Sequence, residues 1–156
     1  MSSHAAPALG TVTALQSALA AEHAAVYGYG VAGAYLSGGQ QATATTDWVA
    51  HQVARDRLEA MLRSAGASQP TAAVAYQLPM PVRNAREAVA LAVVLEDRVA
   101  TAYLGLVALS NTAIRQYGAQ QVQASALRAA AWRGSTVAFP GLTSAALAAP
   151  RPPGSH

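Results

Sequence analysis

Apolar residues recur with helical spacing over several long runs of this chain, and short clusters of polar residues, glycine and proline separate the runs. The first run begins near Thr13 and ends at the glycine turn of residues 37–39. The second follows the threonine-rich residues 43–46, with Asp47 in its first turn, and ends at Gly66. Because strand-type alternation is scarce, the pattern predicts an all-α protein.

The third and fourth helices have boundary signals in the sequence. Asn84 followed by Glu87 has the spacing of a capping box, which predicts the start of a helix. Residues 111–112 mark a short turn, and the fourth helix is predicted over residues 113–133 with Gly134 as its stop. The four helices are therefore expected to form two antiparallel hairpins.

Residues 67–83 connect the two hairpins and contain prolines that disfavour a helix. The segment is longer than a tight turn requires, which indicates a crossover along the height of a bundle and makes the second and third helices parallel. Its alternating Tyr76, Leu78, Met80 and Val82 are expected to pack against the bundle as a strap. The predicted fold is a four-helix bundle of two antiparallel hairpins joined by a long crossover between helices two and three.

The chain length suits one domain with a single core. We expect a bundle over residues 13–142, preceded by a disordered N-terminus of residues 1–12 and followed by a flexible tail of residues 143–156. Residues 135–142 are expected to pack on the bundle through their apolar side chains.

Charged residues make up 11% of the chain, against about 25% in ordinary soluble domains. Alanine coats much of the surface, or a second subunit covers a helix face that is poor in polar residues. Gly28, Gly30 and Gly33 lie in the first helix, where each lowers helix propensity by about 1 kcal/mol relative to alanine. They indicate close approach of another backbone, either within the monomer or at a dimer interface. We expect a homodimer.

The basic residues are all arginine, the net charge is +3 and the pI is near 9.7. Because the arginines are scattered and accompany no RNA-binding motif, nucleic acid is not expected as a partner. The absence of cysteine excludes disulfides and thiolate chemistry. Residues 24–46 are uncharged and long enough to span a bilayer, but their polar residues argue against a membrane segment. No secretory signal is visible, so a cytoplasmic location is expected.

Two isolated carboxylates, Glu22 and Glu96, lie on apolar stripes midway along the first and third helices. A tyrosine follows each of them seven residues later, at Tyr29 and Tyr103, as a weak internal repeat between the halves. Burying an unpaired carboxylate is costly. Groups of opposite charge are therefore expected beside both glutamates.

The chain contains the strings AEHAAVYGYGVAGAYL, HQVARDRLEAMLRSAGA, YQLPMPV, LEDRVATAY and AAWRGSTVAFPGL. These strings resemble the ferritin-like superfamily and, within it, an uncharacterised actinobacterial ferritin-like family of unknown function. The resemblance covers residues 13–142 and implies the ferritin-like fold. It also implies a di-iron ligand set in which two helices supply one glutamate each and the other two supply a Glu-x-x-His pair each.

The two isolated glutamates match the single ligands of that set. Where the resemblance implies Glu-x-x-His, however, this sequence has Gln52-x-x-Arg55 and Ser125-x-x-Arg128. Arginine is not a practical metal ligand, because it is cationic and has no free lone pair. A conventional dinuclear iron or manganese centre, or another cofactor, is therefore not expected.

The main hypothesis for the site is a buried charge network in which guanidinium groups replace metal ions beside the glutamates. Its members are Glu22, Arg55, Glu96 and Arg128. In the other interpretation, both arginines extend to solvent and the glutamates bind water. The residues expected in an adjoining pocket are His23, Tyr29, His51, Gln52, Tyr103 and Ser125.

The sequence favours a non-catalytic protein with a structural or partner-binding role. The competing hypothesis is a metal-binding oxidoreductase with a reduced iron or manganese site made from Glu22, His23, His51, Asp56 and Glu96. A third hypothesis is a small-anion-binding protein with a pocket between the helices, lined by tyrosines and arginines.

Overall fold

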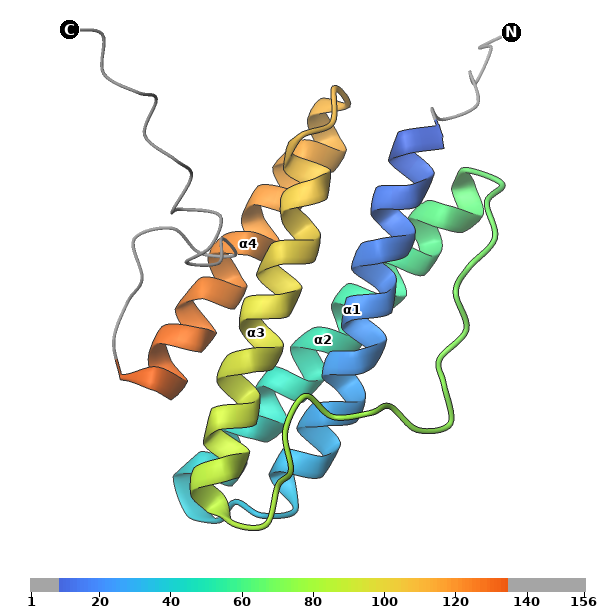
Figure 1. Ribbon diagram of the computed structural model, residues 1–156. Helices are drawn as coiled ribbons and strands as arrows, with labels where there is room; N and C mark the ends of the chain where they lie inside the picture. Colours follow the sequence, from blue (N-terminus) through green and yellow to red (C-terminus); the bar gives the residue numbers. More distant parts are fainter. Residues whose placement is uncertain (1–8, 135–156) are drawn as a thin grey trace, which may run out of the picture.

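The computed structural model describes residues 9–134, which form four α-helices and no strand (Figure 1). The helices are α1 (Leu9–Gly33), α2 (Gly38–Ser64), α3 (Ala85–Val107) and α4 (Thr112–Arg133). Figure 1 shows the segment between α2 and α3 running back along the bundle, so that α2 and α3 are parallel. The predicted all-α bundle of two antiparallel hairpins joined by a long crossover is confirmed.

Two helices begin earlier than the sequence pattern predicted. Helix α1 starts at Leu9, so residues 9–12, which were expected to be disordered, are helical. Helix α2 starts at Gly38 directly after the extended N-cap residue Ser37, and not at the threonine-rich segment. The threonine hydroxyls of residues 43, 45 and 46 donate to carbonyl oxygens four residues earlier at 3.0–3.1 Å, which satisfies them inside the helix.

The predicted helix boundaries at Asn84 and Gly134 are confirmed. The Asn84 side chain accepts a 2.9 Å hydrogen bond from the Glu87 backbone N–H, and the Glu87 carboxylate accepts one of 2.7 Å from the Arg83 N–H. Gly134 ends α4 in the left-handed conformation, with φ of 77°, and its N–H donates to the Ala130 carbonyl at 2.8 Å.

The apolar core consists of two clusters with a polar layer between them. The first contains Leu15, Leu19, Leu58, Leu62, Val99, Tyr103 and Leu106. The second contains Tyr29, Leu36, Leu91 and Leu95, and it is covered by Leu78, Met80 and Val82 of the crossover segment. Alternate residues from 76 to 82 are half-buried and those between them are exposed. The predicted strap is therefore confirmed.

Some predictions lie outside the described residues. They are the packing of residues 135–142, the flexible tail of residues 143–156 and the disorder of residues 1–8. Within residues 9–134, none of the helices has the length and apolar character needed to cross a membrane. The uncharged stretch at residues 24–46 is interrupted by the turn between α1 and α2.

Helices α3 and α4 approach each other closely at Gly118. A Cβ atom at this position would lie 2.7 Å from the Leu106 Cβ and 3.2 Å from the Tyr103 carbonyl oxygen. These neighbours are rigid, since one is a backbone atom and the other is fixed to the backbone. The glycine is therefore required by packing between two helices of the same chain.

We expect Gly118→Ala to destabilise the protein by about 1–3 kcal/mol, because overpacking against backbone atoms forces the helices apart. Gly105→Ala is the matched control in α3, where the nearest atom to a new Cβ is the Ala14 Cβ at 3.8 Å. The control should stabilise by about 0.5–1 kcal/mol. Urea unfolding of both variants measures the difference, and equal stabilisation of the two would contradict the close approach.

Candidate functional site

Three ionisable side chains from three helices meet in the polar layer between the two core clusters. Glu22 of α1, His51 of α2 and Glu96 of α3 have no exposed surface. The His51 Nδ1 lies 2.7 Å from the Glu22 Oε2, and its Nε2 lies 2.9 Å from the Glu96 Oε1. A single imidazole ring therefore bridges the two carboxylates.

Helix α4 supplies the fourth member of this group, Arg128. Its Nε donates to the Glu96 Oε1 at 2.9 Å, and its Nη2 donates to the Ser125 Oγ at 3.2 Å. The Arg128 side chain is 18% exposed, so it reaches the buried carboxylate from the edge of the bundle. We call Glu22, His51, Glu96 and Arg128 the central charge cluster.

Two tyrosines complete the hydrogen bonds of the glutamates in a reciprocal way. The Tyr103 hydroxyl of α3 donates to the Glu22 Oε1 of α1 at 2.8 Å. The Tyr29 hydroxyl of α1 donates to the Glu96 Oε1 of α3 at 2.7 Å. Each helix thus supplies one carboxylate and, seven residues later, the hydroxyl for the carboxylate of the other helix. This exchange gives the internal sequence repeat a physical reason.

A second polar contact connects α2 to α4 beside the cluster. The Trp132 Nε1 donates to the Asp47 Oδ2 at 2.9 Å and lies 3.1 Å from the Tyr29 hydroxyl oxygen. Asp47 is 7% exposed, and burial raises the pKa of its carboxyl group. From the sequence, Asp47 was expected only in the first turn of a helix, whereas it lies inside α2 and bonds to α4. The helical spacing of Asp47, His51 and Leu58 could have indicated this role, because it places the three residues on one buried face of α2.

The charges of the cluster reinforce one another. Burial alone disfavours the charged imidazole, but the hydrogen bonds and negative charges of Glu22 and Glu96 outweigh it and raise the pKa of His51 to about 9. Burial also disfavours the Glu96 carboxylate, yet His51 and Arg128 lower the pKa of Glu96. At neutral pH the centre therefore holds an imidazolium at His51, beside the Glu96 carboxylate and the Arg128 guanidinium.

Arg55 does not belong to the cluster, contrary to the predicted network. Its guanidinium contacts Asp56 at 2.7 and 2.8 Å, and the two side chains are 28% and 63% exposed. Ala54, and not Arg55, occupies the inward position on this face of α2. His51, which was expected only in an adjoining pocket, bridges the glutamates.

The other predicted pocket residues separate into two groups. Tyr29, Tyr103 and Ser125 contact the cluster as described above. The His23 Nε2 lies 3.2 Å from the Pro70 carbonyl oxygen, and its side chain lines an outer recess of about 390 Å³ together with Arg55 and Asp56. Gln52 is half-buried and makes no hydrogen bond to the cluster within residues 9–134.

The five residues considered from the sequence for a smaller metal site do not lie together. Glu22, His51 and Glu96 lie in the cluster, whereas His23 and Asp56 line the outer recess. Within the described part of the chain, no group of three histidine, aspartate or glutamate side chains is placed to hold a metal ion.

The donor set of the cluster also differs from that of a two-metal carboxylate centre. The inward positions with i, i+3 spacing are His51 and Ala54 on α2, and Ser125 and Arg128 on α4. Both nitrogens of His51 already contact carboxylates. Among the described residues, Glu96 Oε2 is the one buried carboxylate oxygen without a hydrogen-bond partner. One such oxygen does not provide the ligands that two metal ions need.

Together, the fold and the site define a four-helix bundle whose centre holds two carboxylates, an imidazole and a guanidinium. Residues 14–144 match the domain of unknown function DUF4439, and the chain belongs to this family. A crystal structure of the conserved hypothetical protein rv2844 from Mycobacterium tuberculosis is similar, with 34% identity and a TM-score of 0.79. The match covers 82% of this chain and 98% of that protein. A comparison with curated proteins found no match.

We expect the stability of the protein to decrease as the pH rises above neutrality. The pKa of His51 rises from 6.5 to about 9 on folding, so its stabilisation is complete below the unfolded value and is lost as the pH passes through the folded value. The loss should be roughly 3 kcal/mol. Urea unfolding between about pH 6 and pH 10 measures it.

His51→Gln is the variant that tests the origin of this slope. It should be less stable than the parent at neutral pH and should lose most of the pH dependence in this range, because glutamine does not titrate. His23→Gln is the matched control outside the cluster and should keep the slope. An unchanged slope in His51→Gln would assign the pH dependence to other groups.

Proposed function

We propose that this protein is a non-catalytic member of the ferritin-like superfamily in which side-chain cations replace the two metal ions. Its role in this proposal is structural or partner-binding. The observation that carries the proposal is the His51 bridge, in which each ring nitrogen contacts a different buried glutamate at 2.7 or 2.9 Å.

The positions of the glutamates support the ferritin-like part of the proposal. That superfamily places one glutamate on each of two helices, and Glu22 and Glu96 lie on α1 and α3 at the centre of this bundle. The other two helices carry His51 and Arg128 toward the same point. The imidazolium and the guanidinium offset the negative charge of the glutamates, which is the role that metal ions have in a metal-bound site.

The geometry also supports a role in stability over a role in chemistry. A general acid or base needs access to a substrate, whereas His51 has no exposed surface and both of its nitrogens are bonded. The two tyrosine hydroxyls donate to glutamates, and burial raises the pKa of both tyrosines. The cluster is therefore suited to stabilising a rigid bundle, and the surface of that bundle would bind the partner.

The test of the metal-free centre is elemental analysis of protein purified without a histidine tag. We expect well below one iron, manganese or zinc ion per chain, and no rise in melting temperature when Mn²⁺ or Fe²⁺ is added. The double variant Ser125→Glu with Arg128→His restores a Glu-x-x-His pair on α4 and should gain metal, which shows that the assay detects a site. Stoichiometric metal in the parent protein that is lost in Glu96→Gln would overturn the proposal.

We further propose that the partner includes a second copy of this chain. Gly30 and Gly33 support this, because a Cβ at either position would meet no atom within 4 Å and neither glycine is needed for packing within residues 9–134. They line a groove of about 460 Å³ beside Trp48, which is 37% exposed.

The cytoplasmic location and the absence of a nucleic-acid partner stay predictions from the sequence.

Light scattering tests the dimer. The parent protein should have the mass of two chains at micromolar concentration, and Gly30→Glu should convert it to a monomer by placing a charge in the groove. Ala20→Glu is the control on an exposed position of α1 and should leave the mass unchanged. A monomeric parent protein would remove the dimer from the proposal.

A further inference from the structure

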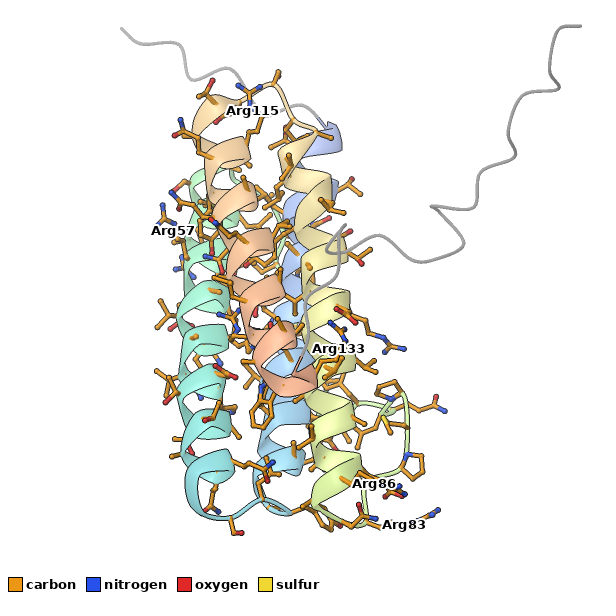
Figure 2. All side chains as sticks on the ribbon, turned by 90° about the vertical axis from the view of Figure 1, so that its left-hand side faces the viewer. Arg57, Arg83, Arg86, Arg115 and Arg133 are labelled. Atoms are coloured by element: carbon orange, nitrogen blue, oxygen red, sulfur yellow. The ribbon has the colours of Figure 1, made fainter. Side chains whose placement is uncertain are left out.

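Helices α2 and α4 lie side by side but are separated by a groove. Figure 2 views the bundle from this side, with α4 in front and α2 next to it. The groove has a volume of about 320 Å³, and four of its lining residues are the small apolar residues Ala50, Val53, Ala54 and Ala124. Val53 is 64% exposed, so the apolar wall is accessible from solvent.

The charged residues of the groove are both arginines. Arg57 and Arg128 line it together with Tyr117 and Gln121, and no acidic side chain is part of the lining. The Arg57 guanidinium carbon lies 4.5 Å from the centre of the Tyr117 ring, which holds this exposed side chain against α4. Arg57 makes no ion pair with a carboxylate in the described part of the chain. Its charge is therefore available to an anion.

The two guanidinium groups mark opposite ends of the groove. Arg57 contacts Tyr117, and Arg128 contacts Ser125, about two turns further along α4. Positions 117 and 125 are separated by about 12 Å along the helix axis, from the rise of 1.5 Å per residue. Alanine and valine side chains, together with Gln121, line the space between the ends. A ligand that fits needs a negative group at each end and an alkyl body.

We propose that the groove between α2 and α4 binds a linear aliphatic dicarboxylate, with one carboxylate at Arg57 and the other at Arg128. The alkyl chain covers Ala50, Val53 and Ala124 and removes their apolar surface from water. In the proposed complex the Arg128 Nε keeps Glu96 and its Nη2 keeps Ser125, so the ligand carboxylate accepts from Nη1. This inference goes beyond the metal-free centre, since Arg57 and the apolar walls would be unchanged if the centre held a metal.

Isothermal titration calorimetry with adipate, suberate and sebacate tests the proposal on the full chain. We expect saturable binding of one ligand per chain, with an affinity that peaks at one chain length because both ends have to be reached at once. Octanoate, which has one carboxylate, should bind at least about tenfold more weakly than suberate, because one charge-assisted contact is lost. Equal binding of sulfate and the dicarboxylates, or no binding at all, would overturn the proposal.

Two variants locate the site without disturbing the buried centre. Arg57→Gln should lower the affinity at least about tenfold, and Val53→Asp should abolish binding by placing a negative charge in the wall. Arg86→Gln removes an exposed arginine of α3 at the opposite end of the bundle from Arg57 (Figure 2) and should bind like the parent protein. Circular dichroism checks the fold of each variant. Unchanged binding by folded Arg57→Gln and Val53→Asp would exclude this groove as the site.

Discussion

The bridge from His51 to Glu22 and Glu96 is the interaction on which the rest of this structure depends. Two carboxylates without any exposed surface would separate three helices if they were left unpaired. A single imidazolium satisfies an oxygen of each, because its two N–H groups point in opposite directions. The guanidinium of Arg128 then adds the second positive charge and extends the network to α4. All four helices therefore meet in one set of directional contacts.

This arrangement also fixes how the helices align along the bundle. Apolar packing between alanine-rich helices tolerates a shift of one turn, because many of the facing side chains are alike. The tyrosines remove that freedom, since Tyr29 reaches the glutamate of α3 and Tyr103 reaches the glutamate of α1. A one-turn shift of α1 against α3 would break both hydrogen bonds together. The polar layer between the two apolar clusters thus specifies a single register.

Local signals in the sequence predicted most of the fold, because they depend on chemistry within a few residues. The Asn84 cap, the Gly134 stop and the proline-punctuated crossover belong to this class. The face of α2 was harder to predict, because polar and apolar residues occur on several sides of that helix. The sequence analysis placed Arg55 in the buried network and His51 in an adjoining pocket, and the structure has the reverse. The need for a positive charge beside the glutamates favoured Arg55 at the inward position of α2, but this position is buried and holds the smaller Ala54.

The His51 bridge could not be predicted from the sequence for a further reason, because it depends on contacts across three helices. Helix α4 packs chiefly on α3, and α2 packs on α1, so α2 and α4 form the most open seam of the bundle. Two side-chain contacts cross between these helices: Trp132 of α4 donates to Asp47 of α2, and the Arg57 guanidinium of α2 packs on the Tyr117 ring of α4. Apolar packing across it is slight, because the apolar residues of the groove, apart from Tyr117, are alanine and valine. A ligand can therefore enter here without opening either core cluster, which makes the seam the place where this bundle can gain a binding function at little cost in stability.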